Sequence, residues 1–106
     1  MARILITQCD VFCNPGRRGH AFPFLVVLQA DAVSDTNTVV VAPLAVASGV
    51  PASRLFPVFH VQGQDWALIM SNLAAVPRRQ LVDRVANLLP DRDRIIAALD
   101  LLFIGF

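Results

Sequence analysis

The two cysteines are the most chemically versatile side chains in this sequence. Cys9 and Cys13 stand four residues apart, which in a regular strand separates them by about 13 Å, too far for a disulfide. The spacing is not Cys-x-x-Cys, and two thiols without a nearby histidine do not make a zinc site. The sequence therefore predicts two reduced, partly buried thiols, with no metal and no cofactor.

The remaining candidates for catalysis fit structural roles better. His60 lies in a strand-like run, where a lone histidine is most often hydrogen-bonded, and Asp91 and Asp93 suit the start of a helix. No phosphate-binding glycine fingerprint, nucleophile elbow or metal-binding histidine pair occurs. All nine basic residues are Arg and all eight acidic ones are Asp, so Schiff-base and P-loop lysine chemistry are excluded. We expect a protein that is not an enzyme.

Length and composition limit the kind of protein further. The chain has 106 residues, of which 56% are hydrophobic and 16% charged, so we expect one folded domain over residues 1–106. Its uncharged stretches contain Pro and Gly, which argues against a membrane span. A net charge of +1 argues against unaided binding to nucleic acid or membrane. The N-terminus does not resemble a secretory signal, so a cytoplasmic location is expected.

The elements that must position these residues are strands first and a helix last. Alternating and continuous apolar runs predict strands at residues 3–12, 22–29, 38–46, 56–61, 66–71 and 72–77. Residues 14–19 form a Pro- and Gly-containing loop, and residues 62–65 form the turn of a hairpin. Trp66, beside that turn, is predicted to belong to the core. Residues 78–89 are ambiguous, with a helical turn possible at 81–88. A mostly β, α+β fold follows.

Residues 90–104 give the clearest helix signal. Pro90 suits the first helical position, Asp91 and Asp93 suit the positive end of the helix dipole, and Gly105 suits the residue after the last turn. At 100° per residue one side should pack on the sheet, and it carries Ile95, Ala98, Leu99, Leu102, Phe103 and Phe106. The other side mixes acids with aliphatic residues: Asp93, Ile96, Ala97, Asp100 and Ile104. The apolar end of the helix predicts a subunit or partner contact, with Phe106 projecting past the helix as an anchor; the alternative is that Phe106 folds back beside Leu99 and Leu102.

Several short segments, in order and at constant spacing, resemble the CcdB family of toxins from bacterial toxin–antitoxin systems. The similarity extends from about residue 24 to residue 106. The segments that carry it are Val41-Ala42-Pro43-Leu44, Arg54-Leu55-Phe56-Pro57-Val58-Phe59-His60-Val61, Trp66, Ala74-Ala75-Val76-Pro77 and Leu102-Phe103-Ile104-Gly105-Phe106.

The resemblance implies a fold and a function. The fold is a small SH3-like antiparallel barrel or sheet with a C-terminal α-helix, assembled as a homodimer. A CcdB-like toxin binds the A subunit of DNA gyrase and traps the cleaved-DNA complex. It is neutralised by a CcdA-like antitoxin, and together they repress transcription of their own operon. DNA is contacted only through the antitoxin.

The resemblance also implies the residues that contact gyrase. The family's terminal tripeptide corresponds to Ile104, Gly105 and Phe106, where Ile104 stands in place of a Trp. The helix side that faces gyrase corresponds to Asp93, Ile96 and Asp100.

Two alternatives remain open. One is a CcdB-like fold without gyrase activity, acting as an antitoxin-binding co-repressor or a decayed toxin. The other is a MazF/PemK-like endoribonuclease, whose only candidate residues are Arg17, Arg18 and His20.

Overall fold

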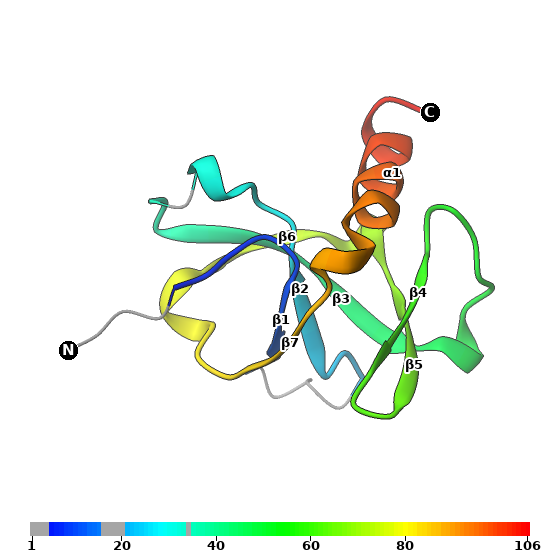
Figure 1. The fold of residues 1–106 in the computed structure, drawn as a ribbon, viewed down its shortest axis with the longest axis horizontal. Helices are drawn as coiled ribbons and strands as arrows, with labels where there is room; N and C mark the ends of the chain where they lie inside the picture. Colours follow the sequence, from blue (N-terminus) through cyan, green and yellow to red (C-terminus); the bar gives the residue numbers. More distant parts are fainter. Residues whose placement is uncertain (1–4, 16–20, 34) are drawn as a thin grey trace.

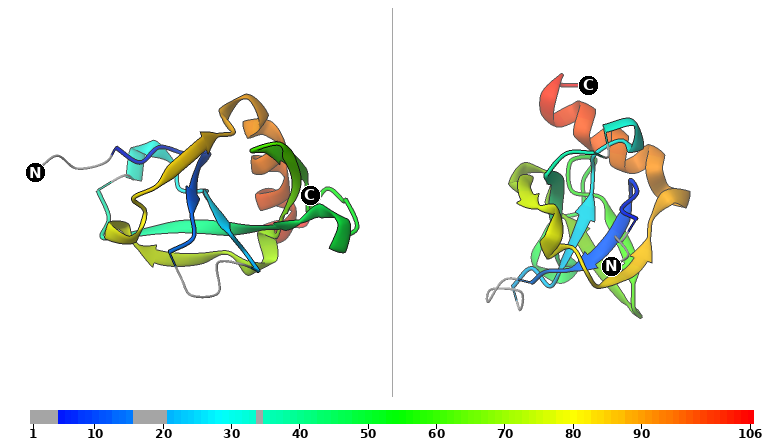
Figure 2. Two further views of the ribbon diagram at one scale, coloured as in Figure 1. Left: turned by 90° about the horizontal axis from the view of Figure 1, so that it is seen from below. Right: turned by 90° about the vertical axis from the view of Figure 1, so that its left-hand side faces the viewer.

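The computed structural model describes residues 5–15, 21–33 and 35–106. Its main elements are one antiparallel sheet and a terminal α-helix, joined by short 3-10 turns and loops (Figure 1). The sheet curls into a half-barrel, and α1 (Arg92–Phe103) follows its last strand (Figure 2). The strands are β1 (Asp10–Cys13), β2 (Phe24–Val27), β3 (Thr38–Val46), β4 (Val58–Val61), β5 (Gln64–Leu68), β6 (Ala74–Pro77) and β7 (Arg84–Asn87). The expected mostly β fold with a C-terminal helix is confirmed.

The long strand β3 is the spine of the sheet, and its bounds are those predicted from the sequence. One edge of β3 pairs with β2, and the other edge pairs first with β6 and then with β5. The strand order is β4-β5-β3-β2-β1-β7, with β6 beside β3. Because β3 has neighbours along both edges and packing on both faces, its side chains are apolar at nearly every position.

The first strand begins later than predicted. Residues 5–7 are irregular, Gln8 and Cys9 form a turn, and β1 starts at Asp10. The backbone amide and the hydroxyl of Thr7 both donate to the Asp10 carboxylate, at 2.8 and 3.1 Å. Such local side-chain bonds compete with strand pairing. Cys9 has a positive φ of 72°, so of the strand predicted around the two cysteines only Asp10–Cys13 is regular.

The hairpin between β4 and β5 is tighter than predicted. Gln62 and Gly63 have φ values of 51° and 78°, which is the conformation of a two-residue turn with both central residues in the left-handed region. Strand β5 therefore begins at Gln64 instead of residue 66 and ends at Leu68. The chain then forms a short 3-10 turn, Met70–Asn72, before β6.

The possible helical turn at residues 81–88 is wrong. Arg84–Asn87 form strand β7, which pairs antiparallel with β1 and has a register shift beside Val11 and Phe12. Pairing with β1 provides hydrogen-bond partners for the backbone N–H and C=O groups of this short segment. The local sequence does not reveal the pairing, because β1 lies far away along the chain. The preceding residues contain a 3-10 turn, Arg78–Gln80, and Leu81 is buried.

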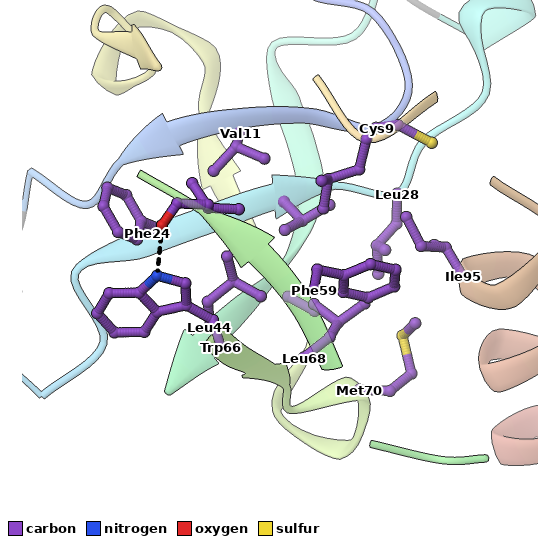
Figure 3. Packing of buried hydrophobic residues seen from close by; sticks show 14 of the residues in the cluster. Cys9, Val11, Phe24, Leu28, Leu44, Phe59, Trp66, Leu68, Met70 and Ile95 are labelled. Atoms are coloured by element: carbon purple, nitrogen blue, oxygen red, sulfur yellow. Dashed lines mark hydrogen bonds between the residues drawn. The ribbon is translucent and has the colours of Figure 1, made fainter. Parts of the chain in front are cut away.

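Two apolar clusters lie on opposite faces of the central strands. The larger cluster sits between the sheet and α1 and includes Phe24, Leu44, Leu68 and Ile95 (Figure 3). Trp66 belongs to it, as predicted: the side chain is 8% exposed, and its indole N–H donates to the Val61 carbonyl at 3.0 Å. Its ring also meets Phe24 edge-on, with centroids 5.1 Å apart. This cluster is the base on which the helix rests.

Candidate partner-binding surface at helix α1

The start of α1 differs in detail from the prediction. A 3-10 turn, Leu89–Asp91, precedes the helix and contains Pro90, so proline does not occupy the first α-helical position. Asp91 stands at the N-cap but makes no side-chain capping bond. Its Oδ1 lies instead 3.6 Å from Nη1 of Arg94. Asp93 lies in the first turn, where its charge suits the helix dipole.

The first half of α1 is held firmly on the sheet. Ile95 and Ala98 are fully buried in the larger cluster. Arg94 donates from Nη2 to the Val58 carbonyl of β4 at 2.7 Å, and its guanidinium lies 4.5 Å from the centroid of the Phe59 ring. Charged hydrogen bonds and cation–π contacts each add to the apolar packing. The helix is therefore a fixed platform and not a loosely attached segment.

The last turn of α1 extends beyond the sheet (Figures 1 and 2). Leu99 and Leu102 are half-buried, whereas Phe103, Ile104 and Phe106 are 67%, 61% and 81% exposed. The prediction that Phe103 packs on the sheet is therefore wrong, and Phe106 takes the exposed position beyond the helix instead of folding back onto it. Helical periodicity gives the direction in which a side chain points, but it does not reveal that the sheet ends before these two residues.

Gly105 ends the helix as predicted. Its φ is 92°, and its N–H donates to the carbonyls of Asp100 and Leu101 at 3.2 and 3.1 Å. A Cβ at this position would meet nothing within 4 Å, so the preference for glycine comes from the left-handed backbone alone. The turn leads Phe106 away from the helix as an exposed apolar side chain.

The six residues that the resemblance assigns to gyrase binding all lie on α1 or directly after it. Asp93, Asp100, Ile104, Gly105 and Phe106 are exposed, and Ile96 is half-buried. The surface they form carries isolated carboxylates between aliphatic and aromatic groups. Such a mixture is typical of a protein contact, because it offers apolar area with a few charges to set orientation.

Catalytic groups do not converge in the described residues. His60 and Asp65 form an exposed pair, with Nδ1 and Oδ1 2.9 Å apart, so His60 is hydrogen-bonded as predicted. The described ranges contain no group of His, Cys, Asp or Glu that could hold a metal ion. Arg17, Arg18 and His20, the candidates for an endoribonuclease, lie outside the described residues.

Both cysteines are free thiols, and the environment of each disfavours the thiolate. Burial is the main cause that raises the pKa of Cys9, and nearby Arg92 opposes it. Burial also raises the pKa of Cys13, and Asp83 adds to the effect. Such thiols are poor nucleophiles.

Sequence reasoning missed the buried charge at Asp10, which is 2% exposed. Its carboxylate accepts from Nη1 of Arg84 at 3.0 Å and from Nδ2 of Asn87 at 2.8 Å. Arg84 also donates to the Leu5 carbonyl at 2.9 Å. These bonds join the start of β1 to β7. The only sign of this role in the sequence was a single acid at the edge of an apolar run.

None of the helices in the described part of the chain has the length and apolar character needed to span a membrane. Compared with models of known families, residues 8–105 match the one described as CcdB protein.

Proposed function

Since the chain belongs to the CcdB family of toxin–antitoxin toxins, we propose that it binds the A subunit of DNA gyrase and poisons the gyrase–DNA cleavage complex. The exposed end of α1 is the observation that carries this proposal. Phe103, Ile104 and Phe106 present aromatic and aliphatic area to solvent at the end of a helix that is fixed to the core. Preorganised apolar side chains are the usual anchors of a protein interface.

The contact residues in this proposal are Asp93, Ile96, Asp100, Ile104, Gly105 and Phe106. Ile104 provides apolar area but no aromatic face for a cation, which is a loss of about 0.5–2 kcal/mol relative to a Trp. Phe103 and Phe106, both exposed, offer aromatic faces close by. We therefore expect gyrase binding that is weaker than a Trp at position 104 would give, but not abolished.

The toxin acts in this proposal by occupying a surface and not by catalysis. It requires no cofactor and meets gyrase in the cytoplasm. A CcdA-like antitoxin neutralises it, and the complex of the two represses transcription, with the antitoxin supplying the contacts to DNA.

The test is a DNA supercoiling and cleavage assay with purified gyrase, run beside an RNA-cleavage assay. Inhibited supercoiling with accumulation of cleaved DNA supports gyrase poisoning. Antitoxin binding without any effect on gyrase contradicts the proposal and favours the co-repressor alternative. That alternative is open because Ile104 stands in place of the family's Trp. RNA cleavage by the purified protein contradicts both and favours an endoribonuclease.

A homodimer is part of the same proposal. Several large apolar side chains are exposed in the isolated chain, among them Leu5, Val82 and Leu89 at 72%, 62% and 56%. A second copy is the simplest cover for some of this surface. Sedimentation at micromolar concentration should give twice the monomer mass, and a monomer would contradict this part.

A further inference from the structure

The turn at the start of β1 holds the chain that leads from β7 into α1. The Cys9 carbonyl accepts from the Leu88 N–H at 2.8 Å. The Asp10 carboxylate accepts from Nδ2 of Asn87, and Oδ1 of Asn87 accepts in turn from the Leu89 N–H, both at 2.8 Å. The backbone between the last strand and the helix (Figure 1) is therefore held at several points by this one turn.

Gln8, in the same turn, holds the first residue of the helix itself. Its Oε1 accepts from Nε of Arg92 at 2.8 Å, and its Nε2 donates to the Leu28 carbonyl at 2.8 Å. Its backbone N–H donates to Oδ1 of Asp31, also at 2.8 Å. Because both the main chain and the amide nitrogen of Gln8 have partners, the oxygen that Arg92 meets has a fixed position.

The backbone conformation of this turn is costly to form. Cys9 has a φ of 72°, in the left-handed region that residues other than glycine rarely adopt. Its N–H donates to the Val27 carbonyl at 2.9 Å, and the next N–H, that of Asp10, donates to the Thr7 carbonyl at 3.1 Å. Strained residues persist where the surrounding structure fixes them, and they cluster where function needs a fixed geometry. Here the fixed geometry presents the Gln8 side chain to α1.

The tilt of α1 depends on directional bonds. The packing of Ile95 and Ala98 holds the helix on the sheet, but apolar packing is non-directional and does not set the tilt by itself. Directional bonds are made by Arg94, which reaches a carbonyl of β4, and by Arg92, which reaches Gln8. One such bond leaves the helix free to pivot about its packed side chains, whereas two bonds at different points define its direction.

A small change of tilt is amplified along the helix. The 12 residues of α1, at about 1.5 Å each, give a length of about 18 Å. A tilt of about 5° at the start therefore moves the far end by about 1.5 Å. Binding groups have to be held within about 0.5 Å of their productive positions. The exposed side chains at the end of α1, Phe103, Ile104 and Phe106, would then be misplaced for a partner.

We propose that Gln8 is a positioning residue for the partner-binding end of α1. It touches no partner itself. Through Arg92 it sets the tilt of the helix and thereby the place of Phe103, Ile104 and Phe106. The inference rests on the proposed function where the partner is the A subunit of gyrase, but the tilt can be measured without gyrase.

Three single variants and one double variant test the proposal. Gln8→Leu removes the acceptor and keeps the size of the side chain, and Arg92→Met removes the donor. Arg92 is exposed, so Arg92→Met remains folded and carries the same test should Gln8→Leu unfold. Gln29→Leu is the matched control, because the Gln29 amide is also hydrogen-bonded but its partners lie outside α1: Val33, Thr36 and Val40.

The first measurement is the tilt of the helix. Residual dipolar couplings of the backbone amides of α1, compared with those of β3, report the direction of the helix relative to the sheet. Gln8→Leu and Arg92→Met should each change this direction by about 5° or more, which is the tilt that misplaces the far end. Gln29→Leu should leave the direction as it is in the parent protein.

The second measurement is inhibition of gyrase supercoiling. Gln8→Leu and Arg92→Met should each need about three to ten times more protein for half-inhibition, because a hydrogen bond from a charged donor is lost. Gln29→Leu should inhibit as the parent does. The double variant of Gln8→Leu and Arg92→Met should be no weaker than either single one, since both remove the same bond.

An unchanged helix direction in Gln8→Leu would overturn the proposal, whatever the effect on gyrase. A changed direction with inhibition equal to that of the parent would overturn it too, and so would single effects that add in the double variant. A parent protein that leaves gyrase active would contradict the gyrase proposal alone, and the dipolar couplings would still decide whether Gln8 directs the helix.

Discussion

Replacing Phe106 with alanine should separate binding from folding at the end of α1. The Phe106 side chain is 81% exposed, so its removal should change the free energy of unfolding by less than about 0.5 kcal/mol. Ile95, on the same helix, is fully buried. Ile95→Ala should therefore lower the free energy of unfolding by about 2–5 kcal/mol, because it deletes packed methylene groups and leaves a cavity. Urea denaturation of both variants measures the contrast.

The expected effect of Phe106→Ala on gyrase inhibition is much larger. Burying a phenylalanine side chain contributes about 1.5–3 kcal/mol, and the exposure of Phe106 leaves most of that gain for a partner. At about 1.4 kcal/mol for each factor of ten, the variant should need about 10–100 times more protein for half-inhibition of supercoiling. Deletion of Gly105 and Phe106 should have at least the same effect, and Ile104→Trp should increase inhibition.

Two results would refute this reasoning. A free energy of unfolding of Phe106→Ala that falls as far as that of Ile95→Ala would mean that the ring packs on the monomer core. Inhibition by Phe106→Ala equal to that of the parent, together with no gain from Ile104→Trp, would mean that the end of α1 does not contact gyrase.

Three further predictions concern stability, each measured as the free energy of unfolding. Arg84→Met should lower the free energy of unfolding by about 2 kcal/mol, because Asp10 stays buried while its cationic partner is removed. The loss is no larger because Arg84 is itself partly exposed. An unchanged value would show that the pair contributes nothing. Gln62→Asn should gain about 0.5–1 kcal/mol, because Asn tolerates the φ of 51° better; a loss would contradict this account of the turn. Burial raises the pKa of Cys9, so the thiol of the unfolded chain ionises first. The contribution of this thiol to stability is therefore fully present below its unfolded pKa, and stability should fall as the pH rises above about 9.0. That fall should be smaller in Cys9→Ala, and an equal slope would assign it to other groups.

Local patterns in the sequence were sufficient to predict the elements that pack strongly against the rest of the fold. The continuous apolar run of β3 predicted both of its ends, because a strand with neighbours on both edges and both faces is apolar throughout. The 3.6-residue period placed Ile95 and Ala98 in the core. Gly105 marked the helix end, because only glycine adopts a φ of 92° without penalty. The resemblance then added the family, which the match over residues 8–105 bears out.

Non-local pairing decided the elements that the sequence placed wrongly. Strand β7 exists because β1, more than seventy residues earlier, offers it a backbone edge. The late start of β1 depends on Asp10, whose carboxylate is also bonded by Arg84 and Asn87. No local window contains both partners of such contacts, so propensity alone favoured a longer first strand and a helical turn near the end.

The same distinction between local and non-local information applies to the exposed surface of the protein. The sequence by itself determined that the last helix has two sides and an apolar end, because side-chain direction follows from helical geometry. Only the tertiary structure decided where support for that helix stops, since the sheet ends before Phe103 and leaves Phe103, Ile104 and Phe106 exposed. It alone brought Gln8 and Arg92, 84 residues apart, within hydrogen-bond distance. The physical reason is that periodicity fixes orientation about an axis, whereas exposure depends on what the rest of the chain places beside it.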